Sequence, residues 1–139
     1  MFNVRRFLLH SGVFAILAIS QAILSMYPFK EELACDLATG FYQEVLLLTL
    51  IISLPYLIVY LLFTQVKRLK NYSFFLYILG VLLWFFQNLS IFESRVACWS
   101  TFTTSEAINY TLSYSFIPIL IATVVFVLAN RRLQNSTVI

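Results

Sequence analysis

Four long apolar segments, separated by short polar stretches, account for most of the 139-residue chain. They cover about residues 7–27, 41–65, 72–92 and 108–129. A helix needs about 20 apolar residues to cross the hydrocarbon core of a bilayer, and each segment is long enough. The pattern predicts an all-α membrane protein: an antiparallel bundle of four transmembrane helices, made of two helical hairpins, in one domain spanning residues 1–139.

The composition supports a membrane protein. Hydrophobic residues make up 61% of the chain and charged residues 11%, whereas a soluble domain carries charge on about a quarter of its residues. Because the chain is too small to bury this excess of apolar residues in its own interior, we expect a lipid bilayer around it. The first segment also resembles a secretory signal peptide. Leu33-Ala34-Cys35 resembles part of a lipoprotein cleavage site, but Glu32 stands where an aliphatic residue is needed and the apolar part ends well before it, which favours an uncleaved span.

The positions of the basic residues predict the orientation of the helices. Lys and Arg concentrate in segments that stay on the cytoplasmic side. We therefore expect both termini and the central loop to be cytoplasmic in a bacterial inner membrane. Of the basic residues, only Lys30 and Arg95 would then lie on the outer side. The formal net charge of +3 comes without a basic patch or recognition motif, so no nucleic-acid partner is expected. The topology-setting residues are Arg5, Arg6, Lys67, Arg68, Lys70, Arg131 and Arg132.

The two cysteines, Cys35 and Cys98, fall in the two outer loops of this topology. Disulfides persist in the oxidising periplasm, so we expect a bond that ties the two hairpins together. The chain-entropy model gives roughly 4 kcal/mol of stabilisation for so long a closed loop. Two free thiols, or a bond to another molecule, remain alternatives. Membrane enzymes that pass electrons from thiols to quinone share this topology, but they rely on a Cys-x-x-Cys pair, which is missing here.

Polar side chains within the spans gather in the outer halves of the predicted helices. In hydrocarbon, such groups must find partners in the protein or in a water-filled cavity. They can form hydrogen bonds between helices, or they can line a polar recess that opens outward and receives a ligand or partner, and both interpretations stay open. The inner halves hold little beyond His10, Ser11 and Thr123. The candidate recess residues are Gln21, Gln43, Glu44, Gln87, Asn88, Asn109 and Ser113.

Other local patterns concern packing and helix ends. Pro55 and Pro118 interrupt the second and fourth segments, and simple kinks are favoured over the broken helices of a transporter. Thr103 and Glu106 have the spacing of a capping box at the start of the fourth helix. A stripe of small residues on the first helix predicts a packing seam, for which a helix of the same chain is favoured as partner. The stripe comprises Ser11, Ala15, Ala18, Ala22 and Ser25.

Nothing in the sequence indicates catalysis or a cofactor. His10 is the only histidine, and a zinc site needs three or four ligands. We expect a non-enzymatic protein that recognises a protein partner within the membrane and at its periplasmic face. It could be an immunity protein against a pore-forming toxin or an accessory subunit of a membrane complex. The alternative is a small-solute transporter or channel acting as an oligomer, and the third choice is a thiol-disulfide redox protein. The oligomeric state stays open.

Overall fold

A computed structural model describes residues 4–31, 40–65, 72–97 and 102–135 of the chain. Its four long helices are α1 (Val4–Met26), α2 (Phe41–Gln65), α3 (Tyr72–Phe92) and α4 (Thr104–Asn135). A short 3₁₀ turn, η1 (Tyr27–Phe29), follows α1, and a π-helical turn, η2 (Glu93–Ala97), follows α3. The described residues include no strand, and the four helices are each long and apolar enough to cross a membrane. The expectation of an all-helical fold with four helices of membrane-spanning length is confirmed.

The helices can be compared with the apolar segments of the sequence. α2 and α3 begin and end at the residues expected from the apolar pattern, whereas α4 is longer than its apolar segment at both ends. The first turns of α4 form because Thr103 and Glu106 make the predicted capping box. The Thr103 amide donates to Glu106 Oε2 at 2.7 Å, and the Glu106 amide donates to Thr103 Oγ1 at 3.4 Å. Two of the otherwise unpaired amides at the helix start are thereby satisfied.

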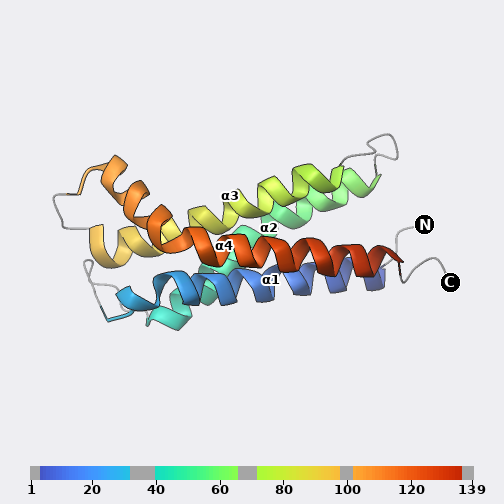
Figure 1. Cartoon of the computed structure of the whole chain (residues 1–139). Coiled ribbons are helices and arrows are strands. Elements are labelled where there is room, and N and C mark those ends of the chain that lie inside the picture. Colours follow the sequence, from blue (N-terminus) through green and yellow to red (C-terminus); the bar gives the residue numbers. More distant parts are fainter. Residues whose placement is uncertain (1–3, 32–39, 66–71, 98–101, 136–139) are drawn as a thin grey trace.

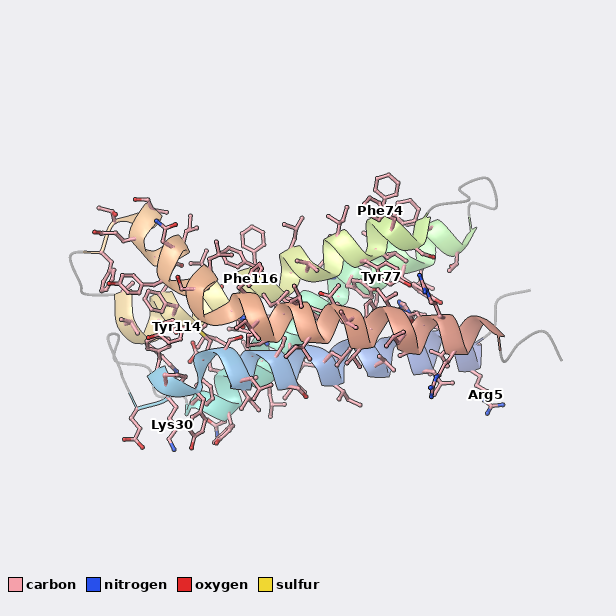
Figure 2. The ribbon with its side chains drawn as sticks, viewed as in Figure 1. Arg5, Lys30, Phe74, Tyr77, Tyr114 and Phe116 are labelled. Atoms are coloured by element: carbon pink, nitrogen blue, oxygen red, sulfur yellow. The ribbon has the colours of Figure 1, made fainter. Side chains whose placement is uncertain are left out.

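The helices lie alongside one another, and α1 begins at the end of the bundle where α4 finishes (Figure 1). Arg5 and Lys30 lie at opposite ends (Figure 2). We call the end with Arg5, Arg131 and Arg132 the basic end. The acidic end is the one that holds Lys30 and Arg95 together with four described carboxylates, which are those of Glu31, Glu44, Glu93 and Glu106.

The stripe of small residues on α1 faces the interior of the bundle. Ala18 and Ala22 are fully buried, and Ser25 is 1% exposed. Small side chains let helix backbones approach closely, and α1 packs most extensively against α4. The predicted seam is therefore used within this chain.

The outer surface of the bundle is apolar. Leu24, Leu50 and Ile117 are each at least 65% exposed, which suits side chains that face lipid rather than water. α2 and α4 continue as helices through Pro55 and Pro118, and α4 bends in its first half (Figure 1). A proline removes one backbone hydrogen bond and clashes with the carbonyl four residues earlier, so a bend near Pro118 is expected.

Candidate functional site

One layer of buried amides and hydroxyls joins all four helices, and we call it the amide layer. Asn88 Nδ2 of α3 donates to Gln21 Oε1 of α1 at 2.8 Å and to Ser115 Oγ of α4 at 2.9 Å. Gln87 Nε2 donates to Thr49 Oγ1 of α2 at 2.8 Å. All five side chains are at most 3% exposed. The amide layer consists of Gln21, Thr49, Gln87, Asn88 and Ser115.

The amide layer is closed by its own hydrogen bonds. The two donors of Asn88 are both used, and Gln21 Nε2 donates to the Ala18 carbonyl at 3.2 Å. Interhelical hydrogen bonds in membranes average about 0.6 kcal/mol each, but an unpaired amide in hydrocarbon costs several times more. The layer therefore fixes which faces of the four helices meet, because a rotated helix would leave an amide without a partner.

The structure separates the seven residues that the sequence grouped as a recess. Gln21, Gln87 and Asn88 meet in the amide layer. Their buried side chains form hydrogen bonds between α1 and α3 and do not line an open hollow. Glu44 lies nearer the acidic end, in an ion pair described below. The other three point away from the core and are exposed, namely Gln43, Asn109 and Ser113.

The polar residues in the first half of α4 lie on two opposite faces of the helix. Ser113 lies on the exposed face of α4, and its Oγ donates to the Asn109 carbonyl of its own helix at 2.8 Å. Ser115 and Thr111 occupy the opposite face and are fully buried. Helical spacing could have distinguished these two faces, since Thr111 and Ser115 are four residues apart and share a side of the helix.

An aromatic layer lies on the basic-end side of the amide layer. The rings of Phe14 and Tyr56 are stacked with centroids 3.8 Å apart, and Phe14 also lies 5.5 Å from Trp84. Phe126 of α4 contacts this group edge-on, with its centroid 5.8 Å from that of Trp84. These four side chains are at most 1% exposed. Such close packing leaves the amide layer separated from the polar groups further along the bundle.

His10 is the centre of a second polar layer, nearer the basic end. Its Nδ1 lies 2.6 Å from Asn130 Oδ1 of α4, and its Nε2 lies 2.8 Å from the Tyr56 hydroxyl of α2. Because the Asn130 oxygen can only accept, the His10 Nδ1–H donates to it. The Tyr60 ring stacks on the imidazole at 4.2 Å. His10 thus links three helices through its two ring nitrogens.

A buried ion pair closes the acidic end. Arg95 Nε lies 2.8 Å from Glu44 Oε2, with side chains 1% and 10% exposed. Arg95 Nη1 donates to the Lys30 carbonyl at 2.7 Å, and the guanidinium lies 5.2 Å from the Phe41 ring. The Ser94 hydroxyl donates to Glu44 Oε1. We call this group the Arg95 clamp, and it ties the end of α3 to the start of α2 and to the residues after α1.

Sequence reasoning placed Arg95 only as a residue outside the membrane and missed its partner. The π-helical turn η2 carries Arg95 inward while leaving Glu93 exposed. Turns of this kind are rare and are enriched at functional sites. No sequence signal marks a π-helical turn. A single Arg within an acidic region does, however, favour an ion pair with a nearby carboxylate.

A hollow of about 460 Å³ lies beside η2 at the acidic end. Polar and apolar side chains line it in similar proportion. α4 begins apart from the end of α3 and approaches α3 further along (Figure 1). The lining residues are Ser90, Glu93, Ser94, Ala97, Phe102, Thr103, Thr104 and Ala107.

Lys30 lies at the same end and outside the spans. Its Nζ lies 3.3 Å from the Tyr27 hydroxyl, and this hydrogen bond raises the pKa of Lys30 above its ordinary value. Its Nζ is also 3.7 Å from Glu31 Oε1. Lys30 is thus protonated at neutral pH and partly offset by an exposed carboxylate.

Several predicted residues lie outside the part of the chain that the structure describes. The expected disulfide belongs to this group, since it joins Cys35 and Cys98. So do three of the residues expected to set the topology, which are Lys67, Arg68 and Lys70.

Within the described ranges, no group of three or more His, Cys, Asp or Glu side chains could hold a metal ion. Comparison of the chain with models of protein families, with curated protein sequences and with solved structures gave no match.

Proposed function

We propose that this chain is a non-catalytic protein of the bacterial inner membrane that recognises a protein partner within the bilayer and at its periplasmic face. The positive-inside rule puts the basic end, and with it both termini, in the cytoplasm. The acidic end is then periplasmic. In this orientation the chain forms two helical hairpins that face the periplasm with their short loops.

One observation carries the proposal: the side chains of the amide layer are bonded to one another, whereas exposed tyrosine side chains collect at the acidic end. Four tyrosine side chains there are each 45–53% exposed. Tyr is enriched in protein interfaces because it offers a large contact area and a polar tip. The four are Tyr27, Tyr42, Tyr110 and Tyr114.

At the basic end, the exposed aromatic side chains that the structure describes include those of Phe74 and Phe75, which have no polar tip. Gln43 and Asn109 are also exposed beside the tyrosines of the acidic end. The surface there suits a partner that is partly in lipid and partly in water. An immunity protein that meets a toxin as it inserts, or an accessory subunit of a membrane complex, would each use such a surface.

The alternative of a transporter or channel is less well supported. A path across the bundle would need to pass from the amide layer to the His10 layer, and the aromatic layer of Phe14, Trp84 and Phe126 lies between them. An oligomer could form a path elsewhere, between copies of the chain.

The test is isolation of the chain from its native membrane in mild detergent, through a tag at the C-terminus. A protein partner in fixed stoichiometry is expected. Replacing Tyr42 and Asn109 with Ala should release it, because both lie on the exposed surface of the acidic end. The matched control replaces Phe74 and Phe75 with Ala at the basic end and should retain it. A chain that is isolated alone, or only with copies of itself, would contradict the proposal and favour transport.

A further inference from the structure

The hollow beside η2 has the chemistry to bind a cationic side chain. It is open at the surface, and its volume of about 460 Å³ lies within the range of about 300–1,000 Å³ typical of ligand pockets. Ser90 and Thr104 supply hydroxyl groups, Glu93 supplies a carboxylate, and Phe102 supplies an aromatic ring. The hollow therefore offers an acceptor at one side and an apolar wall at another.

Among the described carboxylates of the acidic end, Glu93 is the one that is left for a partner. Glu44 is paired with Arg95, and Glu31 lies near Lys30. Glu106 accepts from the amide and hydroxyl of Thr103. Among the described residues, Glu93 has no recorded hydrogen bond or ion pair, and its side chain is exposed beside the hollow.

The local backbone explains why Glu93 stands in this position. η2 turns Arg95 into the Arg95 clamp, where its charge is offset by Glu44 at 2.8 Å. Arg95, two residues along the chain from Glu93, is thus paired in the interior with Glu44. That buried ion pair anchors the π-helical turn that carries Glu93.

The aromatic wall is held by its neighbours. The Phe102 ring lies 5.9 Å from that of Phe92 and 5.3 Å from that of Tyr110. Lys and Arg carry an aliphatic stem and a charged tip, so the stem fits against an apolar wall while the tip reaches a carboxylate. A cation near a ring face gains a further attraction.

We infer that this hollow receives a Lys or Arg side chain of the protein partner on the periplasmic side, with Glu93 as its counter-ion. This inference rests on the proposed function, because it names the chemistry of the partner that the acidic end would recognise. Two variants test it as a matched pair. Glu93→Gln removes the charge at the hollow and keeps the shape, whereas Glu31→Gln removes an exposed carboxylate beside Lys30.

The direct measurement uses a defined probe, a blocked peptide of four arginines, added to the ¹⁵N-labelled full chain in zwitterionic micelles. The amide signals of Ser90 and Thr104 should shift on titration. Binding should be weakened roughly tenfold in Glu93→Gln, as expected for the loss of a charge-assisted hydrogen bond, and should change little in Glu31→Gln. Equal affinities in the wild type and Glu93→Gln would overturn the inference. An equal loss in both variants would also overturn it, since binding would then depend on net charge alone.

The native partner separates this inference from the proposed function. If the wild-type chain retains a partner in mild detergent, Glu93→Gln should lose it and Glu31→Gln should keep it. A partner held equally by both variants would leave the proposed function standing and reject the hollow as its binding site. If the wild-type chain holds no partner, the proposed function fails.

Discussion

The guanidinium of Arg95 lies 2.8 Å from the carboxylate of Glu44, and both side chains are almost fully enclosed at the acidic end of the bundle. Glu44→Gln keeps the shape of the side chain but leaves the buried guanidinium without its counter-charge. Removing one partner of a buried ion pair costs about 3–5 kcal/mol. We expect a loss of that size in the free energy of unfolding, measured by titration with sodium dodecyl sulfate in mixed micelles.

Glu31→Gln is the control for this variant, because that carboxylate is 86% exposed. Exposed ion pairs contribute about 0–1 kcal/mol, so the control should unfold like the wild type. The double variant Glu44→Gln with Arg95→Gln should lose less stability than Glu44→Gln alone, since no buried charge remains. Equal losses in Glu31→Gln and Glu44→Gln would show that the clamp does not stabilise the bundle.

Asn88 and Asn109 offer a comparison of the same residue type in two environments. Asn88 is fully buried in the amide layer with two interhelical hydrogen bonds, whereas Asn109 is exposed on α4. Asn88→Ala should reduce the free energy of unfolding by about 1–2 kcal/mol, given about 0.6 kcal/mol for each such bond and some lost packing. Asn109→Ala should stay within about 0.5 kcal/mol of the wild type. The same unfolding titration checks both, and similar losses would argue against the amide layer.

His10 and Asn130 should be energetically coupled. They are 2.6 Å apart in the His10 layer, on α1 and α4. A double-mutant cycle of His10→Ala and Asn130→Ala should give an interaction free energy of about 0.5 kcal/mol or more, as residues in one hydrogen-bond network do. The control cycle pairs His10→Ala with Ser113→Ala, which lies towards the other end of the bundle, and should be additive within about 0.5 kcal/mol. Additivity in both cycles would contradict the contact.

The disulfide between Cys35 and Cys98 remains a prediction from the sequence. Lys30 and Arg95, which precede the two cysteines by five and three positions in the sequence, do meet: the Lys30 carbonyl accepts from Arg95 Nη1 at 2.7 Å. In membranes isolated without reductant, neither thiol should react with a maleimide until dithiothreitol is added. Reduction should lower the stability by up to roughly 4 kcal/mol. Immediate labelling of both thiols would exclude the bond.

The orientation is tested with fusions at the C-terminus. Because Arg131 and Arg132 lie at the basic end, the positive-inside rule predicts a cytoplasmic tail. Green fluorescent protein fused there should fluoresce, and alkaline phosphatase should be inactive since it needs the periplasm. Alkaline phosphatase inserted between residues 98 and 101 should be active. The reverse pattern would invert the assignment of the acidic end to the periplasm.

The sequence could predict the helices and the capping box because these depend on local patterns. Apolar length alone predicts a span, and Thr103 with Glu106 needs only a spacing of three residues. It could also identify Gln21, Gln87 and Asn88 as polar groups that must find partners in hydrocarbon. The position of each residue in its span predicts its depth in the bilayer. It does not predict which neighbouring helix the side chain faces.

The contacts between distant residues could not be predicted in the same way. His10 and Asn130 are separated by 120 positions, and Glu44 and Arg95 by 51. Whether such groups meet depends on how each helix is rotated about its axis, and the apolar outer surface constrains that rotation weakly because lipid accepts every apolar face. The π-helical turn that brings Arg95 inward is a further feature without a sequence signal.

The sequence by itself thus determined four apolar helices long enough to span a membrane, with most charges at their ends, where a charge need not be buried in hydrocarbon. Only the tertiary structure decided which polar groups are internal, through the amide layer, the His10 layer and the Arg95 clamp. It also separated Asn109 and Ser113 from Gln87 and Asn88. The physical reason is that hydrogen bonds require angstrom-scale placement of groups from different helices, and that placement is a property of the packed bundle.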